Sequence, residues 1–173
     1  MQQLINQHFT LFIALVLLVS RAGDIFTTFL VSPTLKLERN LLARRLGWKY
    51  LFATLLCAFI PYFSIRAGIV FATASLLVSA TNASGILIVR AVGEQEYFRL
   101  LETVVAGTRT RTVLAYRLLP AMFFGLLGFF MLLCLPDSIE DRSRFFATGM
   151  LAYSFAVSVW SIVGVLKQKR KPF

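Results

Sequence analysis

The stretch FTLFIALVLLVSRAGDIFTTFLVS, residues 9–32, is longer than the roughly 20 apolar residues that a helix needs to cross a bilayer. Its only charged residues are Arg21 and Asp24. A cleaved signal peptide is not expected, because residues 1–8 carry no Lys or Arg and the nearest cleavage-like triplet, Ser20-Arg21-Ala22, has an arginine at its centre. We therefore expect an uncleaved membrane-spanning helix here.

The composition of the whole chain is that of a membrane protein. Of its 173 residues, 58% are hydrophobic and 15% are charged, and the mean hydropathy is +0.75. An average soluble domain is about 45–50% apolar and about 25% charged. A chain this short has too little interior to bury that much apolar surface. This excludes a soluble globular domain, a disordered chain and a disulfide-rich secreted scaffold.

Four more apolar segments follow the first, and no repeat or linker divides the chain. We expect one all-α domain over residues 1–173, a polytopic membrane helical bundle of about five transmembrane helices with one or two interfacial amphipathic helices. The expected spans are residues 9–32, 46–63, 67–89, 113–135 and 145–166.

The positive charges are distributed unevenly between the two sides of such a bundle. The chain has 18 Lys and Arg against 8 Asp and Glu. Thirteen of the cations fall around the first connection, the third connection and the tail, whereas Arg66, Arg142 and Arg144 fall on the other side. Cytoplasmic segments are enriched in cations, so we expect a cytoplasmic C-terminus and an external N-terminus. No nucleic-acid partner is expected, because the cations flank apolar segments and no binding fold is visible.

Two cytoplasmic segments are amphipathic. Residues 94–106 place apolar side chains at helical spacing, which predicts a helix on the membrane surface or against the bundle. Residues 35–48 are more basic and are expected at the interface, directly before the second span. The polar residues 107–112 are expected to form a solvated connector, and a contact with anionic phospholipids at the cytoplasmic face is the alternative. The third span contains the small-residue series Ser75, Ser79 and Ala83, which favours close helix packing and a central place in the bundle.

Seven polar residues near the cytoplasmic half of the membrane form the candidate ligand-binding or polar cluster. Arg21 and Asp24 are one turn apart and can pair, and at about 1.5 Å per residue Asp24 and Asn82 lie at a similar depth of about 22 Å. The cluster either fixes helix packing or binds a ligand. We also expect a hydrogen-bonded unit of Asp24, Glu38 and Asn40. The candidates are Arg21, Asp24, Thr28, Glu38, Asn40, Asn82 and Arg117.

No cofactor, metal site or catalytic residue is expected from the sequence. Cys57 and Cys134 lie in apolar runs without a CxxC motif, and the single histidine, His8, cannot supply the histidine ligands of a haem or zinc site. The sequence also lacks the P-loop, GxSxG and HExxH motifs.

Three short motifs carry a resemblance to a known family. They are Gly23-Asp24-Ile25-Phe26-Thr27-Thr28, then Glu38-Arg39-Asn40, then Arg45-Leu46-Gly47-Trp48-Lys49. The chain resembles a family of small uncharacterised bacterial membrane proteins, a domain of unknown function, with Asp-x-x-Thr on the first helix and Glu-x-Asn-Pro before the next. Here Leu41 stands where the family has proline. The resemblance implies a membrane-embedded helical fold in a bacterial inner membrane, with Asp24, Thr27, Glu38 and Asn40 as matching positions, and implies no particular activity.

Two classes of function remain open at this point. The first is a non-enzymatic accessory, assembly or transport-associated component that works with other membrane subunits or as a homo-oligomer. The second is an intramembrane enzyme that acts on a lipid or lipid-linked substrate through Asp24 and Glu38, with a cationic side chain binding phosphate. A self-sufficient transporter or channel is a third possibility, which with five spans would need to oligomerise.

Overall fold

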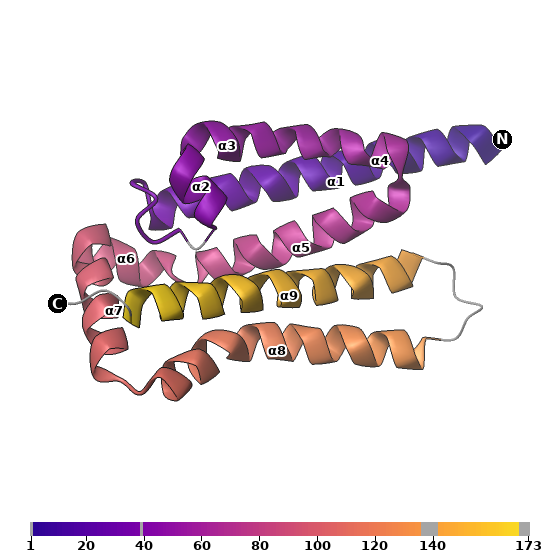
Figure 1. Ribbon diagram of the computed structural model, residues 1–173. Coiled ribbons are helices and arrows are strands. Elements are labelled where there is room, and N and C mark those ends of the chain that lie inside the picture. Colours follow the sequence, from indigo (N-terminus) through magenta and orange to yellow (C-terminus); the bar gives the residue numbers. More distant parts are fainter. Residues whose placement is uncertain (1, 39, 136–141, 170–173) are drawn as a thin grey trace.

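The computed structural model describes residues 2–38, 40–135 and 142–169, and all regular elements within them are helices (Figure 1). The expected all-α bundle is therefore confirmed. The elements are α1 (Gln2–Val31), α2 (Leu41–Leu46), α3 (Trp48–Ala53), the 3-10 helix η1 (Thr54–Phe59), α4 (Ile60–Phe63), α5 (Ile65–Ala83), α6 (Ile86–Val92), α7 (Glu94–Gly107), α8 (Thr110–Cys134) and α9 (Arg142–Lys169).

Four stretches of the described chain are long and apolar enough to cross a membrane by length and composition. The expected second span, residues 46–63, corresponds to Trp48–Phe63, which is a shorter apolar segment than the other four. The four long stretches are Gln7–Val31, Ile65–Val92, Thr110–Cys134 and Arg142–Lys169.

The short segment Trp48–Phe63 changes its helix type along its length. Pro61 has no N–H to donate to the carbonyl of Cys57, which instead accepts from Ile60 N in the tighter 3-10 pattern. A 3-10 helix rises about 2.0 Å per residue instead of about 1.5 Å. The 3-10 portion therefore lengthens the segment, which runs beside α1 in the opposite direction (Figure 1).

The helices pack in a row, with α5 near its middle. The segment α3–α4 lies against α1, α1 packs on α5, α5 on α9, and α9 on α8 (Figure 1). Small side chains permit the close approach: a Cβ on Gly149 of α9 would lie 2.6 Å from the Cβ of Thr73 on α5. The small-residue series thus correctly predicts the central position of this helix.

The third expected span, residues 67–89, is interrupted. It consists of α5 and α6, separated at Ser84 and Gly85. Ser84 Oγ donates to the carbonyl of Thr81 (2.7 Å), and Gly85 N donates to that of Asn82 (3.0 Å). Serine, asparagine and glycine are weak helix formers, and the local hydrogen bonds at Ser84 and Gly85 compete with the helical ones, so the helix is interrupted where these residues cluster.

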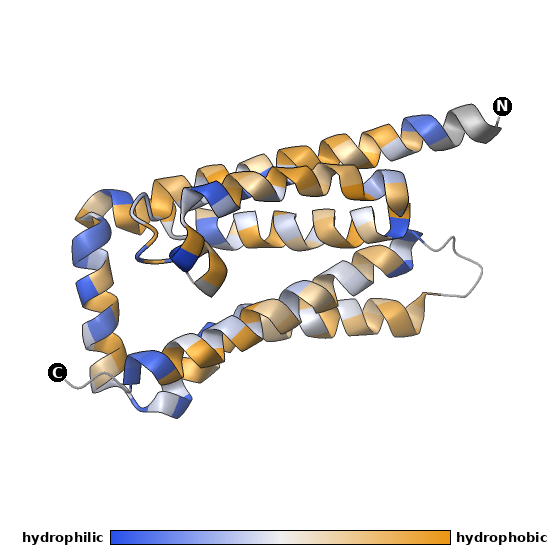
Figure 2. Ribbon diagram, turned by 45° about the horizontal axis from the view of Figure 1, so that its top comes forward, coloured by the Kyte–Doolittle hydropathy of each residue, from blue (hydrophilic) through white to orange (hydrophobic). Residues whose placement is uncertain are grey.

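Helix α7 lies across the end of the bundle at which α9 finishes, and it confirms the amphipathic helix expected at residues 94–106 (Figures 1 and 2). Val105 on its inner face packs with Val113 and Val165. Lys169 Nζ donates to the carbonyls of Ala106 (3.0 Å) and Thr108 (2.7 Å), which places a cation at the negative end of the helix. The other expected interfacial segment, residues 35–48, contains the short helix α2 and ends at the first residue of α3.

Candidate functional site

A line of buried polar side chains follows one face of α1. Ser20, Asp24, Thr28 and Ser32 are each four residues apart, and their exposed fractions are 2%, 8%, 3% and 2%. A spacing of four keeps side chains on one face of a helix, so the line extends about 18 Å along the axis. We call these four residues the polar seam of α1.

The centre of the seam joins α1 to α5 through Asn82. Asn82 Nδ2 donates to Asp24 Oδ1 (3.2 Å) and to Thr28 Oγ1 (3.1 Å). Arg21 Nη1 donates to the other carboxylate oxygen of Asp24 (3.4 Å). The structure therefore brings four of the seven candidates together, and it places Asn82 beside Asp24 as the depth comparison predicts.

The ion pair within this group is long and incompletely bonded. Arg21 reaches Asp24 at 3.4 Å, and the buried Nε of Arg21 has no hydrogen-bond partner among the described residues. Charge-assisted N–H···O bonds are commonly about 2.7–2.9 Å long. Asp24 therefore neutralises the charge of Arg21, but the hydrogen bond between them is a weak one.

The other end of the seam binds a residue that the sequence did not single out, Glu94 at the start of α7. Glu94 Oε1 accepts from Ser32 Oγ (2.6 Å) and Thr34 Oγ1 (2.8 Å), and Oε2 accepts from Thr34 N (3.2 Å). An acidic residue in the first turn of a helix can be recognised from the sequence, because it interacts favourably with the helix dipole. The sequence does not show that the partners of Glu94 are Ser32 and Thr34, which precede it by 62 and 60 residues.

Glu38 and Asn40 form a local unit next to the seam. Asn40 N donates to Glu38 Oε1 (2.7 Å), and Asn40 Oδ1 accepts from Leu42 N (2.9 Å), which caps the start of α2. In the expected three-residue unit, Glu38 and Asn40 are thus bonded to one another, while Asp24 bonds across to α5.

Arg117 lies elsewhere in the row of helices. Its guanidinium is 3.8 Å from the position that a Cβ on Gly164 of α9 would occupy. Helix α8 packs on α9 (Figure 1), whereas the polar seam bonds to Asn82 on α5. The inclusion of Arg117 in one cluster with Asp24 is therefore corrected, because depth along a span does not fix helix order.

The bonded group of Arg21, Asp24, Thr28 and Asn82 acts as a clamp between α1 and α5. Both carboxylate oxygens of Asp24 accept hydrogen bonds from within the chain, and the side chain is almost closed to the outside. Within the described ranges, no group of three or more His, Cys, Asp or Glu is placed to hold a metal ion. The hydrogen bonds from Asn82 satisfy buried polar atoms of Asp24 and Thr28 and join α1 to α5.

No family model, curated protein or solved structure matches this chain. The resemblance over residues 20–50 therefore stays a prediction that rests on Asp24, Thr27, Glu38 and Asn40. In the structure Thr27 bonds within its own helix, since its Oγ1 donates to the carbonyls of Gly23 (2.9 Å) and Asp24 (3.1 Å).

Proposed function

We propose that the protein is a multi-pass protein of a bacterial inner membrane and serves as a non-enzymatic accessory, assembly or transport-associated component of a membrane complex. The observation that carries this proposal is the closed state of the Asp24 group. A catalytic carboxylate needs to reach a substrate, whereas Asp24 is 8% exposed and bonds to Arg21 and Asn82. Its geometry suits the holding of α1 against α5.

The edge of the row offers a surface for another subunit or a second copy. In the apolar stretch of α8, 11% of residues are buried within the chain, against 33% in α1. Large apolar side chains project from it, among them Leu119, Met122, Phe123, Leu126 and Phe130. Among the helices long enough to span, α8 therefore has the greatest share of its surface left for lipid or protein neighbours.

A second candidate is an intramembrane enzyme that acts on a lipid or lipid-linked substrate through the carboxylates of Asp24 and Glu38. Two carboxylates that converge on a substrate can share acid–base work or a Mg²⁺ ion whose shell is completed by substrate phosphate. This candidate requires the Asp24 group to open.

Native mass spectrometry of the intact protein, released from its membrane in mild detergent, tests the proposed function. We expect a stoichiometric assembly with another polypeptide or a second copy of the chain. A monomer would contradict the proposal, and a monomer that converts an added phospholipid would establish the second candidate.

The orientation of the proposed membrane protein gives a separate prediction. We propose that the end of the bundle with α2, α7 and the end of α9 faces the cytoplasm, because most of the Lys and Arg residues lie in the connections and the tail at this end. In a background with Cys57→Ala and Cys134→Ala, we introduce a cysteine by Gln7→Cys or Lys167→Cys, both at exposed positions. A membrane-impermeant maleimide should label the first in intact spheroplasts and the second only after permeabilisation. The opposite pattern would reverse the topology.

A further inference from the structure

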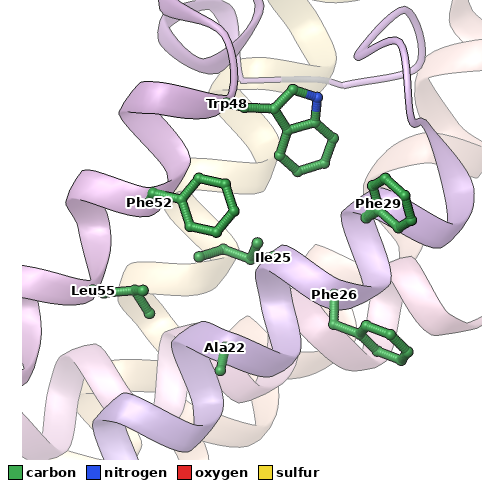
Figure 3. A pocket seen from close by; sticks show the side chains of 7 residues that line it. All are labelled: Ala22, Ile25, Phe26, Phe29, Trp48, Phe52 and Leu55. Carbon is green, nitrogen blue, oxygen red and sulfur yellow. The ribbon is translucent and has the colours of Figure 1, made fainter.

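An apolar groove runs between α1 and the start of the Trp48–Phe63 segment (Figure 3). Its volume of about 460 Å³ lies within the roughly 300–1,000 Å³ range of small-molecule sites. Seven side chains line it: Ala22, Ile25, Phe26, Phe29, Trp48, Phe52 and Leu55. The one polar atom among these side chains, Trp48 Nε1, already donates to the carbonyl of Pro33 (3.1 Å). The lining therefore suits a hydrocarbon chain.

The groove opens sideways, where the bilayer would lie. Its floor is Ile25, which is buried, whereas Phe26, Phe29 and Phe52 on its walls are 61%, 53% and 57% exposed. From Ala22 to Phe29 it extends about 10 Å along α1, which fits within one leaflet of about 15 Å. A lipid chain can thus enter from the membrane without crossing a polar barrier.

Positive charge gathers at the Trp48 end of the groove. Arg44 and Arg45 on α2 and Lys49 on α3 are exposed, and none of the three has an ion pair among the described residues. The sequence from residue 40 to residue 93 contains no acidic side chain at all. An apolar groove with cations at a single end complements an amphiphile with an anionic headgroup.

We propose that this groove binds one acyl chain of an anionic phospholipid, whose phosphate lies at Arg45 and Lys49. A partner helix would also cover apolar side chains, but it gives no reason for cations concentrated at one end. Basic residues near a membrane surface each add attraction to anionic headgroups, and burial of the chain adds a hydrophobic contribution. The proposal does not depend on whether the protein is an enzyme.

Trp48 can report directly on the occupant. The chain contains two tryptophans, so Trp160→Phe leaves Trp48 as the sole indole. We measure Trp48 fluorescence after reconstitution into phosphatidylcholine vesicles that contain equal mole fractions of either brominated phosphatidylglycerol or brominated phosphatidylcholine. Bromine quenches on contact, so the expected result is stronger quenching by the anionic lipid, with an apparent preference of at least about fivefold.

Two matched charge variants separate a specific site from a general attraction of the basic face. Arg45→Gln with Lys49→Gln removes the cations beside the groove and should bring the preference close to one. Arg109→Gln with Arg111→Gln removes two exposed cations near the start of α8 and should leave it unchanged. If both variants lose the preference for the anionic lipid to the same extent, a specific headgroup site at Arg45 and Lys49 is contradicted. Equal quenching of the starting protein by both lipids would overturn the choice of an anionic lipid, and no quenching by either would contradict the presence of a lipid chain in the groove.

Discussion

Replacing Asp24 by alanine is expected to lower the free energy of unfolding by about 3–5 kcal/mol, the cost of removing one partner from a buried ion pair. The change would leave Arg21 as an unpaired cation within a membrane-embedded helix, and Asn82 would lose an acceptor. The measurement is the thermal midpoint of the protein in mild detergent, followed by size-exclusion chromatography.

Two further variants show whether charge or packing causes the loss. Asp24→Asn should be more stable than Asp24→Ala, because the amide oxygen can still accept from Asn82. Arg21→Leu combined with Asp24→Leu removes both charges and should recover much of the stability lost in Asp24→Ala. If Asp24→Ala unfolds at the same temperature as the wild type, Asp24 does not hold α1 to α5. If Asp24→Asn folds normally but abolishes a lipid-converting activity, Asp24 belongs to an enzyme site.

Replacing Glu94 by alanine is expected to loosen α7 from the end of α1. Three hydrogen bonds from Ser32 and Thr34 would be lost, and hydrogen bonds to a charged group contribute about 1.5–3 kcal/mol. The consequence is an increase of about tenfold or more in amide hydrogen exchange along α7, as measured by mass spectrometry.

Glu96→Ala supplies the matched control for this experiment. Glu96 lies on the same helix, and its side chain is 65% exposed and pairs with the exposed Arg99 at 3.6 Å. Exposed pairs contribute about 0–1 kcal/mol, so exchange in α7 should change little. Equal exchange in the Glu94 and Glu96 variants would mean that α7 is held in place without the Glu94 contacts.

The sequence predicts well those features that depend on local periodicity. Apolar runs locate the helices, the small residues of α5 predict its central position, and the rise of a helix gives Asp24 and Asn82 a similar depth. That these two side chains meet depends on which faces of α1 and α5 pack together, and a similar depth does not fix those faces. The 3-10 segment before Pro61 has a local cause as well, but its effect on span length depends on how many residues adopt the tighter helix.

Features that depend on the order of helices in the row could not be predicted. Arg117 has the expected depth, yet its helix packs on α9 and not on α1. Glu94 bonds to residues that a broken helix and a long connection bring near it. Both outcomes depend on how each helix is rotated about its axis and on which helices pack together. A single sequence determines neither.

A double-mutant cycle between Asp24 and Asn82 tests most directly whether the polar seam fastens α1 to α5. The unfolding free energies of Asp24→Ala, Asn82→Ala and the double variant are compared with that of the wild type in one detergent. A hydrogen bond between these side chains predicts a coupling of about 0.5 kcal/mol or more. Effects that add to within about 0.3 kcal/mol would show that the two residues act independently and would contradict the clamp.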